Sequence, residues 1–120
     1  MKIRTIEAMN LAMEQYFTDK QIRAMKDAVL TGCWGDCDIE FNGETHRAYG
    51  FFSNSVKDSG NFSSRQIGGI FSGISKRIKA TRCDLVLSFH DWWEDGSGDM
   101  LFFNTDFIDE VILEKWAETN

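Results

Sequence analysis

The densest group of oxygen ligands in the sequence lies in residues 91–99, Asp-Trp-Trp-Glu-Asp-Gly-Ser-Gly-Asp, which contain four acidic residues. Hard cations such as Ca²⁺ bind several oxygens on a turn of this kind. In a standard calcium-binding loop, however, Trp93 would stand where Asp or Asn is needed, and Phe102 where a bidentate Glu is needed. We therefore predict no metal ion here. The alternatives are an acidic hairpin loop or a contact with another protein through Trp92, Trp93 and Asp95, since tryptophan is enriched at interface hot spots.

The thiols and imidazoles of the chain could be combined into a zinc site, made of Cys33, Cys37, Cys83, His46 and His90. The spacing of the first two cysteines is not the C-x-x-C of zinc ribbons, and no second paired motif follows. Ordinary reduced thiols are therefore favoured, and we predict no cofactor.

Ser88, His90 and Asp91 are the residue types of a hydrolytic triad. Triad members usually come from distant segments, and the sequence lacks the G-x-S-x-G turn that often presents the nucleophile. Nucleotide-binding glycine motifs are also missing. We predict a protein without catalytic residues, and keep a small metal-dependent hydrolase, using His46, His90 and the acids of 91–99, as an alternative.

Residues 63–80 carry the clearest binding pattern. Apolar residues recur at helical spacing, at Ile67, Ile70, Phe71, Ile74 and Ile78. A helical projection places a small, basic stripe on the opposite side, made of Arg65, Gly69, Ser72, Gly73 and Lys76. Each glycine inside a helix costs about 1 kcal/mol relative to alanine, so we expect a compensating gain. Either a partner approaches this stripe closely, or a neighbouring element of the same chain covers it.

Charge is distributed unevenly along the chain, whose net charge is −6. Residues 65–82 contain five basic side chains and no acid, whereas residues 83–120 contain ten acids and one base, Lys115. The two blocks either neutralise each other in the fold or form separate charged surfaces.

The elements that position these residues follow from periodicity and turn signals. Helical spacing predicts a helix over 3–17, and Thr18-Asp19-Lys20-Gln21 has the form of a capping box that opens a second helix. Alternation over 36–50 with Asn42-Gly43 as a two-residue turn predicts a β-hairpin, which would pair Asp38 with Arg47.

The second half of the chain is predicted as a loop over 53–62, a helix over 63–80 opened by a capping box, strands over 85–89 and 100–104, and a helix over 107–118. The inward side chains of the last helix are expected to be Ile108, Val111, Ile112 and Trp116. The predicted fold is α+β in the order α-α-β-β-α-β-β-α, with about four mostly antiparallel strands in two hairpins and four helices.

Two aromatic doublets, Phe51-Phe52 and Phe102-Phe103, place apolar rings on both faces of the sheet, because adjacent strand residues point in opposite directions. Either helices cover both faces, or one face is a contact surface. Four helices are enough for the first arrangement, which we expect.

Length and composition predict a single globular domain over residues 1–120. No apolar run approaches the roughly 18 residues of a membrane span, and the first residues lack the apolar region of a signal peptide. We therefore expect a cytoplasmic protein with reduced cysteines.

These features favour a small acidic protein that binds another protein and regulates or inhibits it. In one form of this hypothesis, the acidic C-terminal third imitates a phosphate backbone toward a nucleic-acid-handling complex, as phage- and plasmid-encoded inhibitors of restriction and CRISPR systems do. Direct nucleic-acid binding through the basic residues of 65–82 is the alternative. Both a monomer and a homodimer are compatible with the sequence.

Overall fold

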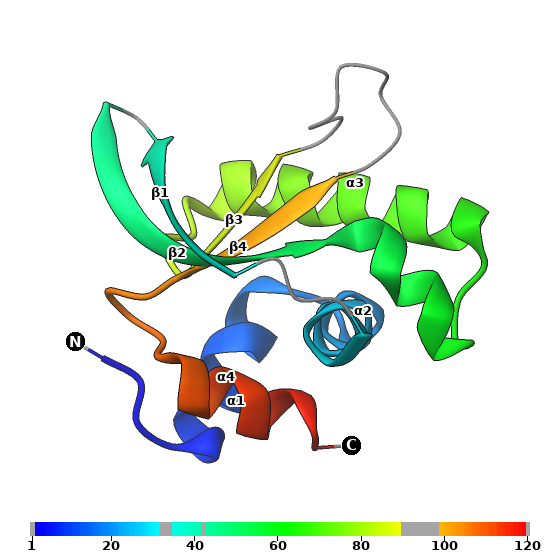
Figure 1. Ribbon diagram of the computed structural model, residues 1–120, viewed down its shortest axis with the longest axis horizontal. Helices are drawn as coiled ribbons and strands as arrows, with labels where there is room; N and C mark the ends of the chain where they lie inside the picture. The colour runs from blue at the N-terminus through cyan, green and yellow to red at the C-terminus, as the bar shows by residue number, and fades with distance from the viewer. Residues whose placement is uncertain (1, 32–34, 42, 90–98, 120) are drawn as a thin grey trace.

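The computed structural model describes residues 2–31, 35–41, 43–89 and 99–119, and contains both helices and strands. The elements are α1 (Ile6–Tyr16), α2 (Asp19–Thr31), β1 (Gly35–Phe41), β2 (Glu44–Phe52), the 3-10 helix η1 (Ser53–Ser59), α3 (Ser64–Thr81), β3 (Val86–Phe89), β4 (Met100–Asn104) and α4 (Glu110–Ala117) (Figure 1). The fold is mixed α+β, and the predicted order of four helices and four strands is confirmed.

The four strands form one antiparallel sheet in the order β1-β2-β4-β3. The first hairpin has the register that its short turn predicts, with Asp38 opposite Arg47. Arg47 Nη1 donates a hydrogen bond to Asp38 Oδ1 at 3.3 Å. Gly43 adopts a φ of +81°, a conformation that side chains disfavour. A two-residue turn therefore fixes which face each side chain of the hairpin occupies.

Polar side chains set where the helices begin. α1 begins at Ile6 rather than at residue 3, because Thr5 accepts a hydrogen bond from the backbone N–H of Ala8 and caps the helix. The capping box predicted for α2 is present: Thr18 and Gln21 each accept a backbone N–H from the other.

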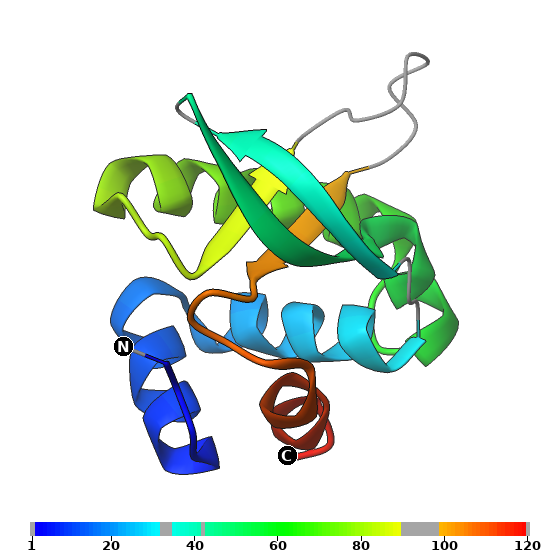
Figure 2. The same ribbon diagram turned by 60° about the vertical axis from the view of Figure 1, so that its left-hand side comes forward.

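The helices pack against one face of the sheet. The main core cluster joins Phe51 and Phe103 of the sheet to Met25 of α2, Phe71 of α3 and Trp116 of α4. Figures 1 and 2 show α3 lying along the sheet and α1, α2 and α4 grouped together below it. The Trp116 ring is fully buried, and its Nε1–H donates to Asn10 Oδ1 at 3.1 Å. This hydrogen bond joins α4 to α1.

The opposite face of the sheet carries a second, smaller cluster, made of Ile39, Ala48, Leu87, Met100 and Phe102. All five come from strands, and among the described residues no helix contributes to this cluster. The expectation that helices cover both faces is therefore wrong. The aromatic doublets do place rings on both faces of the sheet. Such a doublet indicates that both faces are apolar, but it does not predict which element covers each face.

Two local predictions also need correction. The segment predicted as a loop over 53–62 begins with η1, which ends where Gly60 takes a φ of +77°. In the last helix, Val111 is 59% exposed, although it was expected inward. Asp109 caps this helix by accepting the backbone N–H of Ile112, so the helix begins later than predicted. Its buried residues include Leu113, which was not among those expected inward.

A buried carboxylate holds η1 on α2. Asp27 is 4% exposed, and its Oδ2 accepts hydrogen bonds from the Ser59 hydroxyl at 3.1 Å and the Asn61 amide at 3.0 Å. The connection between β2 and α3 is thereby attached to the helical layer. Within the described residues, none of the helices has both the length and the apolar character needed to span a bilayer.

Candidate functional site

α3 is the longest helix that the structure describes, and its sequence accounts for its position. Ser63 and Gln66 form the predicted capping box, with hydrogen bonds of 2.8 and 3.2 Å to each other's backbone N–H groups. The predicted apolar stripe is inward, with Ile67, Phe71, Ile74 and Ile78 buried and Ile70 half-buried. The stripe turns the opposite side of α3 away from the core.

The outer side of α3 carries the five stripe residues predicted from the sequence. Arg65, Gly69 and Lys76 are exposed, and Ser72 and Gly73 are half-buried. A Cβ added to Gly69 would have no atom within 4 Å, whereas one added to Gly73 would lie 3.1 Å from Nε2 of Gln21 on α2. The stripe is therefore open at Gly69 and touches α2 at Gly73.

The basic side chains of α3 have no ion pair with any described residue. Among the described residues, the one ion pair between permanently charged groups joins Arg47 to Asp38, and the His46 ring lies 3.7 Å from carboxylate oxygens of Glu44 and Asp106. Arg77 donates from Nε to the carbonyl oxygen of Tyr16 at 2.8 Å. In the described part of the chain, the acidic block thus does not neutralise the basic helix through direct contacts.

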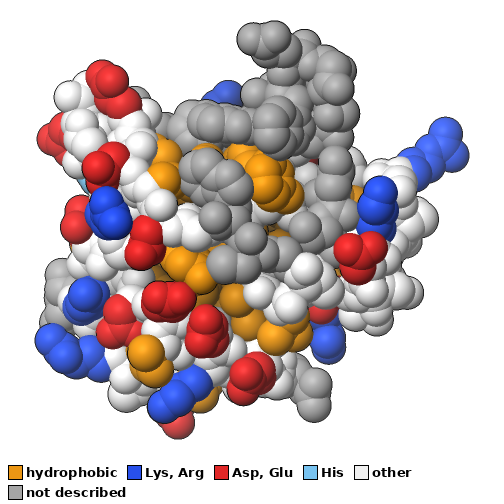
Figure 3. All heavy atoms as spheres, viewed as in Figure 1, with side chains coloured by type: hydrophobic (Ala, Val, Ile, Leu, Met, Phe, Trp, Pro, Cys, Tyr) orange, Lys and Arg blue, Asp and Glu red, His pale blue; other side chains and the backbone are white. Residues whose placement is uncertain are grey.

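Two acids of the C-terminal third have local structural contacts. The Asp109 side chain caps α4, and Asp106 Oδ2 lies 3.7 Å from Nδ1 of His46. Glu110 and Glu114 are exposed on α4. Figure 3 shows acidic side chains gathered on the face formed by α1 and α4.

The remaining predicted contact residues, Trp92, Trp93 and Asp95, lie outside the described residues, as do His90 and Cys33. Within the described ranges, no three His, Cys, Asp or Glu side chains are grouped so that they could hold a metal ion. Of the residues considered for a zinc site or a hydrolase, His46, Cys37, Cys83 and Asp99 are described. His46 lies between two carboxylates, with Nε2 3.7 Å from Glu44 and Nδ1 3.7 Å from Asp106.

The two described cysteines are free thiols. Burial raises the pKa of Cys83, more than hydrogen bonds from the backbone N–H groups of Val86 and Leu85 lower it. Burial also raises the pKa of Cys37, and the carboxylate of Asp38 raises it further. A raised pKa leaves less thiolate, so neither environment is that of an activated nucleophile.

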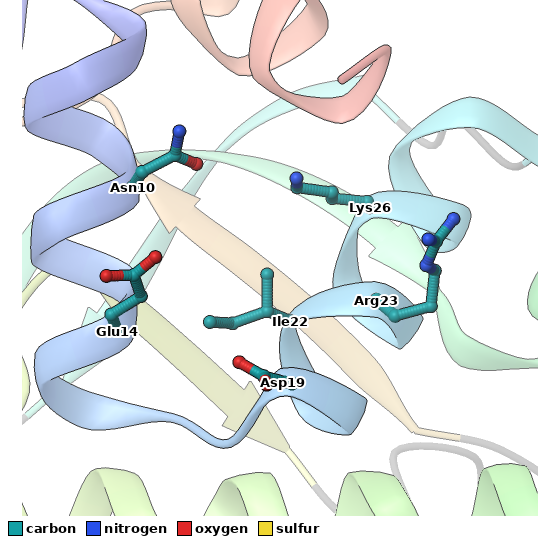
Figure 4. A pocket seen from close by; sticks show the side chains of 6 residues that line it. All are labelled: Asn10, Glu14, Asp19, Ile22, Arg23 and Lys26. Carbon is teal, nitrogen blue, oxygen red and sulfur yellow. The ribbon is translucent and has the colours of Figure 1, made fainter. Parts of the chain in front are cut away.

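A polar pocket between α1 and α2 has a volume of about 260 Å³. Figure 4 shows the six side chains that line it, which are Asn10, Glu14, Asp19, Ile22, Arg23 and Lys26. Sequence analysis did not select these residues.

Lys26 is the buried cation of this pocket, with only 8% of its surface exposed. Its Nζ donates to the Thr119 hydroxyl at 2.9 Å and lies 5.3 Å from the centre of the Trp116 ring. Burial lowers the pKa of Lys26, and the positive charge of Arg23 lowers it further, while Glu14 raises it. The sequence does contain a signal for this site. Lys26 follows Ile22 by four residues and therefore lies on the side of α2 that is otherwise apolar.

The chain matches no protein-family profile, no curated protein and no solved structure. Its function must therefore be inferred from its own residues.

Proposed function

We propose that this chain is a small acidic binding protein that regulates or inhibits another protein, and that an acidic segment of the partner docks on the outer face of α3. The observation that carries the proposal is a set of exposed cations without an ion pair to any described residue: Arg65, Lys76 and Lys79 on α3, and Arg82 at its C-cap. Four positive charges along one element, unpaired within the described part of the chain, attract an acidic surface.

The small residues of α3 support a close contact. Within the described residues, nothing lies within 4 Å of a Cβ placed on Gly68 or Gly69, so packing in this part of the chain does not explain these two glycines. Together they cost about 2 kcal/mol of helix stability relative to alanine. A partner backbone that approaches between Arg65 and Lys76 would gain contact area there and offset this cost on binding.

The net charge of −6 disfavours nucleic acid, because the whole molecule repels a polyanion at long range, whereas a protein can present a local acidic segment without being a polyanion as a whole. The same α3 cations would nevertheless contact phosphates if nucleic acid bound, and such binding weakens steeply with salt. The experiment below separates the two.

The test is affinity capture from cell extract with three forms of the chain. These are the wild type, the α3 variant Lys76→Glu/Lys79→Glu, and the control Lys2→Glu/Lys115→Glu, which makes the same change in net charge at two exposed lysines elsewhere. We expect a protein that the wild type and the control retain and that the α3 variant loses, also after nuclease treatment.

A purified partner then allows a quantitative measurement. Gly69→Leu adds a side chain where the structure has open space, so the variant should fold normally and bind about tenfold more weakly or worse. Equal capture by all three forms, or unchanged affinity of Gly69→Leu, would contradict docking on α3. Capture that nuclease abolishes would replace the proposal with the nucleic-acid alternative.

The phosphate-mimicry form of the proposal, directed at a nucleic-acid-handling complex, concerns α4. Because Asp109 and Asp106 have structural contacts, their reversal would disturb the fold as well as the charge. Glu110→Lys/Glu114→Lys reverses two exposed charges of α4 instead. Binding of the purified partner that is insensitive to this change and to salt would exclude mimicry.

A further inference from the structure

We infer that the pocket between α1 and α2 is a binding site for a small molecule that carries both an ammonium group and a carboxylate, of the amino-acid class. This inference is independent of docking on α3. It rests on the shape of the pocket, on the arrangement of its charges and on the fixed position of two of its polar side chains.

The volume limits the size of the ligand. Pockets for drug-sized ligands measure about 300–1,000 Å³, and this one has about 260 Å³. The pocket therefore suits a molecule with few heavy atoms. A small ligand gains little from apolar contact, so its affinity must come largely from polar groups.

The charges of the pocket are divided between its two sides. In Figure 4 the carboxylates of Glu14 and Asp19 lie on one side and the ammonium group of Lys26 on the other, with the Ile22 side chain between them. Arg23 adds a second cation on the side of Lys26. A ligand with a single charge would meet a like charge in the pocket, whereas a zwitterion aligned with this division would have an opposite charge at each end.

None of these charges is paired with an opposite charge from a described residue. Among the described residues, no ion pair involves Glu14, Asp19, Arg23 or Lys26. The first two carboxylates and the guanidinium group are exposed at the mouth of the pocket. The four charged groups therefore line one small pocket without pairing with one another.

Two side chains on the Lys26 side are held in place before any ligand binds. The hydroxyl of Thr119 and the ring of Trp116 position the Lys26 ammonium group. Trp116 also donates to Oδ1 of Asn10, which fixes the orientation of that amide at the pocket. Fixed donors lower the entropy that binding costs.

The test is a titration of the labelled protein by NMR with four amino acids of increasing chain length: glycine, β-alanine, γ-aminobutyrate and ε-aminocaproate. Butylammonium and butyrate serve as the single-charge probes. We expect at least one amino acid to bind about tenfold more tightly than both single-charge probes, with the shifted amides in α1 and α2. Failure of every amino acid to exceed the single-charge probes would overturn the inference, as would shifts confined to other elements.

Variants test whether the charges of the pocket are responsible. Glu14→Gln/Arg23→Gln neutralises one charge on each side and changes only exposed side chains, so the fold should persist. We expect it to weaken binding of the best amino acid by about tenfold. Glu7→Gln/Lys20→Gln removes the same charges from exposed positions of α1 and α2 outside the pocket and should bind as the wild type does. Equal loss in both variants, or loss in neither, would contradict the inference.

Discussion

Lys26 carries a charge into a nearly closed environment, where the Thr119 hydroxyl and the Trp116 ring contact its ammonium group. Lysine is rarely buried to this degree without partners, because the desolvation of an ammonium group is costly. The hydrogen bond and the aromatic ring offset part of this cost. Burial is the main cause of the lowered pKa of Lys26, and the positive charge of Arg23 lowers it further.

The stability of the protein should therefore depend on pH through Lys26. Its pKa lies below 10.5 in the folded chain, so between that pKa and 10.5 the unfolded chain binds more protons than the folded one. In this window the free energy of unfolding rises with pH. We expect the stability of the wild type relative to Lys26→Met to increase as pH rises from neutral toward 10.5, measured by urea unfolding with tryptophan fluorescence.

The control is Lys20→Met, which removes an exposed lysine from the same helix. The difference between the wild type and this control should be nearly constant over the same pH range. A constant or falling difference for Lys26→Met would show that burial of Lys26 has no influence on its titration.

Residue-level predictions from the sequence succeeded where a local pattern determines the contact. The Asp38–Arg47 pair follows from the hairpin turn, and the Ser63–Gln66 pair follows from the capping box. The pocket was missed because its lining side chains come from two helices. In addition, Lys26 is held by Thr119, which lies far away in the sequence. Helical spacing along one helix does not report which side chains of a neighbouring helix face it.

At the scale of elements, replacing a glycine by alanine should change the free energy of unfolding in opposite directions in α3 and in the first hairpin. Gly69 lies in a helix with open space around it, so Gly69→Ala should raise the free energy of unfolding by about 1 kcal/mol. Gly43 has a φ of +81°, and Gly43→Ala should lower it by about 1–2 kcal/mol.

Urea unfolding of the two variants beside the wild type measures both changes. The comparison is direct, because neither position has an atom within 4 Å of the added Cβ and only backbone conformation differs. A loss of stability in Gly69→Ala would mean that α3 requires this glycine for its own packing, and the argument for a partner would lose its support.

Element order, hairpin register and the capping boxes that start α2 and α3 could be predicted because each depends on residues close in sequence, whereas the caps at Thr5 and Asp109, which start α1 and α4 later than predicted, were missed. The arrangement of helices about the sheet could not. The pattern of α4 predicted Val111 inward, whereas the structure exposes Val111 and buries Leu113 in the main core cluster, where α4 packs against α1 and α2. The packing of every described helix on one face is likewise a property of tertiary contacts.

At the scale of the whole molecule, Cys83 reports on global unfolding. It is 2% exposed within the main core cluster, and burial raises its pKa. In a Cys33→Ser/Cys37→Ser background, we expect a thiol reagent such as DTNB to react with Cys83 at least about a hundredfold more slowly in the native state than in urea. Comparable rates in the two states would show that this part of the core opens locally.

Contacts between the two ends of the chain complete the helical layer. Ile3 forms a bridge with Ile108, Trp116 donates to Asn10, and Lys26 donates to Thr119, and each of these contacts spans 93 residues or more. During synthesis on the ribosome, α1 and α2 therefore emerge long before the segment that covers them. We expect the nascent chain to keep the apolar side of α1 accessible to chaperones until α4 has left the exit tunnel and can pack against it.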